Sequence, residues 1–310
     1  MISSPTFLFA GGGTGGHLFP GIAIADELRR RNNSARIVFV GSTRDIEAKI
    51  LTEHRIEHRT LAVESLTTWK RSPYRFVRGN WQAWRAAKRL LNELHPSAVI
   101  GLGGYASAPL VWAASRCRVP VILIEQNVIP GRTTRWLSRF ADHVCVTFEE
   151  SRSRLTGARQ ITVTGNPVRE QIAALHANSP LTSPQSVDII SKPTLLILGG
   201  SQGADSLNDA VMAAISRLPE MVSDWKLIHQ TGPRQVDQIR SMYSNLGLNA
   251  QVESFFYDLP QRYASATVVI SRAGATTLAE LACDGVPMIL VPYPHAADDH
   301  QRENAFAPGV

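Results

Sequence analysis

A histidine follows directly after a glycine-rich turn near the start of the chain. Residues 7–20 read FLFAGGGTGGHLFP, in which a short apolar run leads into Gly11, Gly13 and Gly16 and then into His17. The G-x-G-x-x-G spacing after a strand lets the backbone approach a diphosphate closely and directs amide N–H groups and a helix N-terminus toward it. A histidine at this place could accept a proton from a hydroxyl nucleophile, and it could equally cap the helix or pack against it.

A second apolar run and glycine-rich turn of the same kind occurs in TLLILGGSQGA at residues 194–204. Neither turn is followed by Lys-Ser or Lys-Thr, which excludes a Walker A phosphate loop. A nicotinamide dinucleotide site would need Asp or Glu at the end of its second strand, whereas RIVFV at residues 36–40 is followed by Gly41 and Ser42. The sequence therefore predicts two nucleotide-type α/β domains and disfavours an NAD-dependent oxidoreductase.

Two further apolar runs end in residues that could reach a ligand. AVIGLGGYASAP at residues 98–109 runs into a Gly-Gly turn, and PVILIEQN at residues 120–127 ends in three polar residues. The carboxyl ends of parallel strands meet at one edge of a sheet, so Glu125 and Asn127 are candidate site residues. A loop-capping role is the alternative for each of them.

The second half carries two polar constellations. In SRAGATTLAELACDGVP at residues 271–287, small and hydroxyl side chains begin a predicted helix that carries Glu280 about one turn later. The helix N-terminus could hold a diphosphate and Glu280 could accept hydrogen bonds from a ribose diol; an exposed helix glutamate is the alternative. VPYPHAADDHQRENA at residues 291–305 lacks the spacing of a metal site, so recognition of sugar hydroxyls is the better interpretation.

Short apolar runs alternate with segments of helical periodicity along most of the chain. Runs such as TFLFA, RIVFV, PVILIE, TLLIL and PMILV are typical of buried strands. This alternation predicts the α/β class with mostly parallel sheets. The segment SPLTSPQSVDIISKP is rich in Pro and Ser and has poor periodicity. We therefore predict an N-terminal Rossmann-like domain at residues 1–165, a hinge and linker at 166–193, and a C-terminal Rossmann-like domain at 194–310.

The composition predicts a cytoplasmic globular protein. The 310 residues, 44% of them hydrophobic and 19% charged, suffice for two domains. No apolar run reaches the ~18 residues of a membrane-spanning helix, the start MISSPTFLFA has no secretory signal pattern, and the three cysteines suggest buried thiols. Residues 1–165 hold 23 Lys and Arg against 12 Asp and Glu, while the remainder hold 9 against 14, so the first half should prefer an anionic partner.

Positive charge is most concentrated between Ser65 and Asn92, where seven Lys or Arg and no acid occur. The aromatic residues interleaved with them are Trp69, Tyr74, Phe76, Trp81 and Trp84. Aromatic side chains that bury among lipid headgroups, beside cations that attract anionic lipid, suit a membrane surface. A core helix with a solvated basic face is the alternative, and nucleic acid ranks third because no nucleic-acid-binding module accompanies the segment.

Seven motifs, in this order, resemble those of the MurG family of glycosyltransferases: GGGTGGHLFPGIAIA, GLGGYASAP, EQN, GNPVR, GGSQGA, SRAGATTLAEL and VPYPHAADDHQ. The resemblance covers nearly the whole chain. Members of that family transfer N-acetylglucosamine from UDP to the 4-hydroxyl of the muramyl-pentapeptide on undecaprenyl diphosphate, which converts lipid I to lipid II in peptidoglycan synthesis. The resemblance implies the GT-B fold, in which two Rossmann-like domains face each other across a cleft, with the acceptor on the first and UDP-N-acetylglucosamine mainly on the second.

The resemblance also implies the residues of the site. The donor-binding residues would be Thr14, Gly15, Gly16, Asn127, Arg169, Ser201, Phe256, Ala275, Thr276, Thr277, Leu278, Ala279, Glu280, His300 and Gln301. The acceptor-side candidates are Gly13, Gly103, Gly104, Tyr105 and Glu125, and His17 would be the base of an inverting single displacement. Helix termini would stabilise the leaving diphosphate, so we expect no cofactor and no bound metal. The enzyme would work as a peripheral protein at the cytoplasmic face of the bacterial membrane.

One departure from the family pattern concerns the end of the chain. Family members usually continue for several dozen residues beyond the HQ motif, whereas this sequence ends at Val310. We therefore expect the second domain to lack its closing elements. A GT-B enzyme that glycosylates a different lipid, and a UDP-sugar-binding remnant without turnover, are the alternatives to the main hypothesis.

Overall fold

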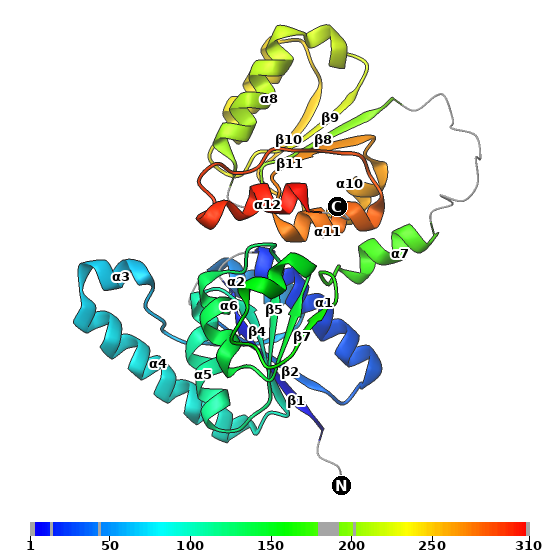
Figure 1. The fold of residues 1–310 in the computed structure, drawn as a ribbon. Coiled ribbons are helices and arrows are strands. Elements are labelled where there is room, and N and C mark those ends of the chain that lie inside the picture. Colours follow the sequence, from blue (N-terminus) through cyan, green and yellow to red (C-terminus); the bar gives the residue numbers. More distant parts are fainter. Residues whose placement is uncertain (1–3, 13–14, 43–44, 179–191, 201–202, 308–310) are drawn as a thin grey trace. The chain divides into compact units, whose positions relative to one another are not determined.

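The computed structural model describes residues 4–12, 15–42, 45–178, 192–200 and 203–307. The chain divides into two compact units, Met1–Pro167 and Val168–Val310, and each has its own parallel sheet with helices packed on it (Figure 1). The predicted α/β class with two parallel-sheet domains is confirmed. No described helix combines the length and apolar character that crossing a membrane requires.

Unit 1 is a seven-stranded sheet in the order β3-β2-β1-β4-β5-β6-β7. Its strands are β1 (Thr6–Gly11), β2 (Arg36–Gly41), β3 (Glu57–Thr60), β4 (Ala98–Gly103), β5 (Val121–Glu125), β6 (His143–Val146) and β7 (Ile161–Val163). Its α-helices are α1 (Gly15–Arg31), α2 (Asp45–Glu53), α3 (Leu66–Arg71), α4 (Pro73–Leu94), α5 (Ala108–Arg116) and α6 (Arg132–Leu137). Short 3-10 turns are η1 (Tyr105–Ser107), η2 (Ser138–Phe140) and η3 (Glu149–Arg154). The strand order reverses direction between β1 and β4, which is where doubly wound sheets bind ligands.

Successive side chains of β1 pack on opposite faces of the unit 1 sheet. Leu8 is buried in one apolar cluster together with Val38 of β2, while Phe9 points to the other face and stacks on Phe39 with ring centroids 4.7 Å apart. Such two-sided burial explains why the central strands read as continuous apolar runs. The sheet therefore provides a rigid edge for the loops that follow its strands.

Unit 2 repeats the same order with five strands, β10-β9-β8-β11-β12. The strands are β8 (Thr194–Leu198), β9 (Lys226–Gln230), β10 (Ala250–Glu253), β11 (Val268–Ser271) and β12 (Met288–Leu290). The α-helices are α7 (Glu170–Asn178), α8 (Asp205–Arg217), α9 (Val236–Asn245), α10 (Leu259–Ser265), α11 (Ala275–Asp284) and α12 (His300–Phe306), and the 3-10 turns are η4 (Pro219–Val222) and η5 (Ala297–Asp299). Here the switch point lies between β8 and β11.

The segment predicted as hinge and linker contains structure of the second unit. Helix α7 contacts α10 and α11, and Ile172 within it is fully buried in an apolar cluster with Leu281 of α11. Residues 168–178 thus pack as part of unit 2, while residues 179–191 of the predicted linker lie outside the described residues. The linker prediction missed the apolar contact of Ile172, because it was based on the Pro- and Ser-rich composition further along the chain.

Candidate functional site

In unit 1, the ends of β1 and β4 bring His17 to the switch point. Gly11 pairs with Gly103 where the strands end, and His17 is the third residue of α1. The imidazole lies against the turn after β4, because a β-carbon built on Gly103 would be 3.3 Å from Cε1 of His17 and one built on Gly104 would be 3.8 Å from Cδ2. Gly104 has φ 71°, a left-handed conformation that favours glycine. Close approach of the turn to the histidine therefore depends on these two glycines.

Four of the residues predicted around this point are brought together, namely Gly16, His17, Gly103 and Gly104. Tyr105 begins η1 directly after them, and its ring lines an apolar groove between α4 and α5. Two of the predicted positions, Gly13 and Thr14, lie outside the described residues, as does Ser201 of unit 2.

The predicted pair Glu125 and Asn127 forms a closed loop after β5. Oε1 of Glu125 accepts hydrogen bonds from the backbone N–H of Asn127 at 3.0 Å and from its side-chain amide at 3.1 Å, and Oε2 accepts one from the N–H of Gly131 at 2.9 Å. The Glu125 side chain is buried. These are the hydrogen bonds expected if Glu125 and Asn127 cap the loop, which is the alternative given above to a role as site residues. They hold the loop beside the Gly103 turn, where Oγ1 of Thr134 lies 3.8 Å from the β-carbon positions of both Gly103 and Gly131.

In unit 2, helix α11 begins at the switch point behind a glycine cap. Gly274 is the N-cap residue, and a β-carbon built on it would meet no atom within 4 Å. Thr276, Thr277 and Ala279 are half-buried along the first turns, whereas Ala275 and Leu278 have buried side chains. The N–H of Leu278 already donates to the carbonyl oxygen of Gly274 at 3.0 Å, so a ligand at this N-terminus would meet the first turn before it and the side chains of the two threonines.

The predicted donor residues Arg169 and Glu280 form one buried ion pair. Nε of Arg169 donates to Oε1 of Glu280 at 2.8 Å, and its terminal nitrogen donates to Oε2 at 2.9 Å, with both side chains at most 12% exposed. The hydroxyl of Tyr263 donates to Oε2 at 3.3 Å. Burial and the neighbouring Glu280 carboxylate hold the pKa of Tyr263 well above its usual value, so the phenol keeps its proton. Glu280 is thus held on three sides at the end of the first turns of α11.

Two side chains tie the loops of this edge together. Arg272, which follows β11, donates to the hydroxyl of Ser206 at 2.6 Å and to the carbonyl oxygen of Val291 at 3.1 Å. The buried amide of Asn304 in α12 donates to the carbonyl oxygen of Ala273 at 3.2 Å. The first turn of α8, the loop before α11 and the segment after β12 therefore converge at the carboxyl edge of the unit 2 sheet.

Gln301 and His300 sit in this converged segment with fixed hydrogen-bond roles. Oε1 of Gln301 accepts the N–H of Tyr293 at 2.9 Å, which leaves the amide nitrogen as a donor. Nδ1 of His300 lies 2.8 Å from the carbonyl oxygen of Ala297, so this nitrogen donates, and in the neutral imidazole Nε2 is then the acceptor. Both side chains are half-buried. One amide donor and one imidazole acceptor suit recognition of sugar hydroxyls.

Phe256 contributes to the core of unit 2. Its side chain is buried, the guanidinium carbon of Arg262 lies 3.7 Å from the ring centroid, and its N–H donates to Oε1 of Gln230 at 3.0 Å. The ring and the N–H are therefore used inside the protein. Contact of this residue with a base would have to be made by its carbonyl oxygen.

A buried polar network supports the glycine turn after β8. His229 is fully buried, with Nδ1 3.1 Å from the hydroxyl of Tyr243 and Nε2 3.1 Å from Oδ1 of Asn208. Asn208 donates in turn to the carbonyl oxygen of Thr231 at 3.0 Å and to Oε1 of Gln235 at 2.7 Å. Oδ1 of Asn208 lies 3.1 Å from the β-carbon position of Gly199, so the network abuts the turn. Burial lowers the pKa of His229 to about 4.

Stability is expected to decrease as the pH falls from about 6.5 toward 4. The unfolded chain protonates His229 first, because the folded-state pKa of about 4 is the lower one. The neutral imidazole therefore makes its full contribution to the free energy of unfolding only above pH 6.5. About 2 kcal/mol of that free energy should be lost by pH 5. Urea unfolding of the full chain at pH 7.5 and 5.0 measures this. His229→Gln, which has no titrating group, should show a smaller pH dependence; an unchanged dependence would contradict the assignment.

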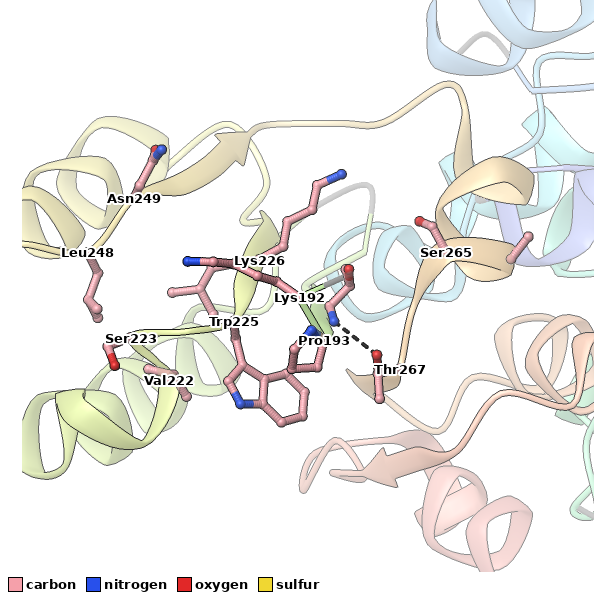
Figure 2. A pocket seen from close by; sticks show the side chains of 13 residues that line it. Lys192, Pro193, Val222, Ser223, Trp225, Lys226, Leu248, Asn249, Ser265 and Thr267 are labelled. Atoms are coloured by element: carbon pink, nitrogen blue, oxygen red, sulfur yellow. Dashed lines mark hydrogen bonds between the residues drawn. The ribbon is translucent and has the colours of Figure 1, made fainter. Parts of the chain in front are cut away.

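A hollow of about 1060 Å³ lies at the opposite edge of the unit 2 sheet (Figure 2). It is lined by Thr194 and Lys226, which begin β8 and β9, by Thr267 before β11, and by the ring of Trp225. None of the predicted site residues that the structure describes lines it. Because ligands of doubly wound sheets bind beyond the carboxyl ends of the strands, this hollow does not belong to the candidate site.

The sequence interpretation missed several of the residues that hold the site. Tyr263, Arg272, Asn208 and His229 all act through contacts with segments distant in sequence. The available signal was weak: Arg272 stands inside a motif already singled out, and a histidine in the middle of the KLIHQ strand must be buried. Neither pattern specifies the partner.

Two family models match the chain, one for each unit. The glycosyltransferase family 28 N-terminal domain matches residues 7–146, and the glycosyltransferase family 28 C-terminal domain matches residues 194–307. Together they cover most of both sheets described above.

Curated relatives and a solved structure agree with this match. A UDP-N-acetylglucosamine–N-acetylmuramyl-(pentapeptide) pyrophosphoryl-undecaprenol N-acetylglucosamine transferase of Geotalea uraniireducens is 41% identical over 305 residues, covering 97% of this chain and 81% of the relative. The protein of the same name from Syntrophotalea carbinolica is 41% identical over 306 residues, with the same coverage. The crystal structure of Acinetobacter baumannii MurG superposes with a TM-score of 0.71 at 29% identity, covering 97% of this chain and 81% of that one.

Proposed function

The chain belongs to glycosyltransferase family 28, in its MurG branch, and from this premise we propose how its residues transfer N-acetylglucosamine from UDP to the muramyl-pentapeptide of lipid I, giving lipid II. It is a hexosyltransferase of peptidoglycan synthesis. The observation that supports the residue assignments most strongly is the position of His17 against the Gly103–Gly104 turn at the switch point of unit 1. The converged loops of unit 2 supply the groups suited to a nucleotide sugar.

The donor binds mainly on unit 2. The N-terminus of α11 holds the diphosphate through the backbone of its first turn and the hydroxyl groups of Thr276 and Thr277, which are half-buried. Glu280, oriented by Arg169 and Tyr263, accepts from the ribose diol with its remaining lone pairs. Gln301 donates its amide to a hydroxyl of the sugar.

The reaction is a single displacement on the anomeric carbon. The 4-hydroxyl oxygen of the acceptor forms the new bond to that carbon while the bond to the diphosphate oxygen breaks, and the electron pair leaves with UDP. The imidazole of His17 accepts the hydroxyl proton. Positive helix-terminal dipoles at α11 stabilise the charge that develops on the diphosphate, so transfer should proceed without a divalent metal.

Transfer of labelled N-acetylglucosamine from UDP to a short-chain lipid I analogue, in the presence of EDTA, tests this proposal. Product formation is the expected result. UDP-galactose with a diacylglycerol acceptor serves as the control, since preference for that pair would favour another lipid glycosyltransferase. UDP-sugar binding without turnover would contradict the catalytic assignment, and turnover only on adding a divalent metal would contradict the metal-independent mechanism.

We propose that α3 and α4 hold the protein to the cytoplasmic face of the membrane. Trp69, Tyr74, Val77 and Trp81 are each about half exposed or more. A groove of about 540 Å³ between α4, α5 and α6 is lined mainly by aromatic and aliphatic side chains, including Trp84, Trp112 and Trp136. Helix α4 lies along α5 on the outside of unit 1 (Figure 1). Apolar rings flanked by cations are suited to an anionic lipid surface.

Neutralising the cations beside this groove should weaken binding to anionic vesicles. The triple variant of Arg85, Lys88 and Arg89 to Gln removes three charges that line an adjoining hollow on α4. At about 1 kcal/mol per cation, the affinity should fall about a hundredfold in cosedimentation with phosphatidylglycerol-containing vesicles. Lys226→Gln, an exposed cation of unit 2, is the matched control. If the unmodified protein bound neutral vesicles as tightly as anionic ones, an electrostatic contribution would be contradicted.

A further inference from the structure

Glu47 is a fully buried acidic residue behind the first glycine turn. It belongs to α2, and its side chain has no exposed surface. Glutamate is almost never fully buried unless its carboxyl group is paired. Here Oε2 accepts the backbone N–H of Ser42 at 3.0 Å and Oε1 accepts its hydroxyl at 2.6 Å, which anchors the side chain at the end of β2.

Two glycines make the space that the Glu47 carboxyl group occupies. A β-carbon built on Gly12, after β1, or on Gly41, at the end of β2, would overlap Oε2 of Glu47. Because β1 and β2 are parallel neighbours, these glycines lie at the same edge of the sheet. Side chains at either position would exclude the carboxyl group. The carboxyl group of Glu47 therefore packs directly on the backbone of Gly12 and Gly41.

A short series of contacts connects Glu47 to the imidazole within unit 1. The carbonyl oxygen of Gly12 lies 3.3 Å from the β-carbon position of Gly104, and that position is 3.8 Å from Cδ2 of His17. The order is Glu47, Gly12, Gly104 and His17. A displacement of the Gly12 backbone would thus be transmitted to the Gly103–Gly104 turn, on which the imidazole rests.

We propose that Glu47 is a positioning residue that fixes the backbone of Gly12 and, through the Gly103–Gly104 turn, sets the placement of His17 for proton transfer. The inference rests on the proposed role of His17 as base. A misplacement of about 1 Å in a catalytic group can reduce the rate about a hundredfold, so the effect should appear in kcat. Most of the residues assigned to the donor belong to unit 2, so UDP affinity should change much less than kcat.

The test is a double-mutant cycle in the full chain, with kcat measured for transfer to a lipid I analogue and UDP affinity measured by calorimetry. Glu47→Ala should lower kcat about 10- to 100-fold and leave the UDP dissociation constant within about twofold. Glu47→Gln, whose amide oxygen still accepts the Ser42 N–H, should stay within about threefold of the parent. Glu53→Ala, at an exposed position of the same helix, is the matched control and should have no effect.

In a His17→Ala background, Glu47→Ala should cause little further loss, because its effect is exerted through the imidazole. Losses that multiply in that background would overturn the proposal, as would a Glu47→Ala enzyme with unchanged kcat. An unmodified protein that transfers no sugar would refute the proposed function instead, so the two failures are distinguishable.

If Glu47→Ala folds poorly, the same contact can be tested from its other side by enlarging Gly12. Gly12→Ala places a methyl group against the carboxyl group and should reduce kcat by a similar factor. Combining Gly12→Ala with Glu47→Ala should recover part of this loss, because the methyl group then enters the vacated space. A double variant whose loss equals the product of the single losses would overturn the proposed contact.

Discussion

His17→Ala is expected to lower kcat by about two to four orders of magnitude while leaving UDP affinity nearly unchanged. The imidazole lies beside the Gly103–Gly104 turn of unit 1, and most of the groups assigned to UDP belong to unit 2. Removal of a general base affects the transition state, in which the acceptor proton is moving, more than it affects the bound donor. Steady-state kinetics with a lipid I analogue, together with calorimetry of UDP binding, measure the two quantities separately.

The matched variant is His17→Asn, which keeps a polar group near the turn but cannot act as a base at neutral pH. Its kcat should be as low as that of His17→Ala. Recovery of activity by asparagine would point to a capping or packing role for His17. A fall in UDP affinity by the same factor as kcat would likewise indicate a structural role.

Arg169→Met is expected to lower the free energy of unfolding by about 3–5 kcal/mol. The substitution leaves the Glu280 carboxyl group, which is 4% exposed, without its bidentate partner. Breaking a buried pair on one side leaves an uncompensated buried charge, whereas replacing both partners by apolar residues removes the charge as well. Urea unfolding of the full chain measures the loss.

The double variant Arg169→Met with Glu280→Leu separates stability from donor binding. Its free energy of unfolding should return close to that of the parent. Its UDP affinity should nevertheless be lost, because the groups assigned to the nucleotide are gone. Arg169→Lys is the conservative control, because it retains the charge but not the two-point geometry. Its free energy of unfolding should lie between those of the parent and Arg169→Met. Normal UDP binding by the double variant would contradict the donor role of this pair.

The central strands of both sheets could be predicted because they are buried on both faces. Runs such as those of β1, β5 and β8 have continuous apolar sequence, and the alternation with helices identified the class. Strand β3, with the sequence EHRT, and the three-residue β7 lie at the two edges of the unit 1 sheet. These two strands pair on one side only and carry no such apolar signal, so they were not identified, whereas the edge strand β12 was identified from its apolar run although it is only partly buried.

Site residues on glycine turns could be located from sequence, whereas their partners could not. Arg169 and Glu280 were each proposed as a separate contact to the donor, yet they are 111 residues apart and bind each other. Glu47 received no assignment at all, because an acidic residue in an amphipathic helix usually faces solvent. Its burial depends on two glycines from neighbouring strands that a linear pattern does not relate.

The packing of α7 on α11 has a consequence for the order of events during synthesis. Residues 1–167 leave the ribosome first and contain all the strands of their own sheet, so unit 1 has the contacts to fold while the remainder is being made. Arg169 emerges next, but its partner Glu280 follows 111 residues later. At bacterial elongation rates this is a wait of roughly 5–20 s. During that interval Arg169 lacks its counter-charge, and α7 has only part of its apolar contacts, namely those with β8 and α10, until α11 appears.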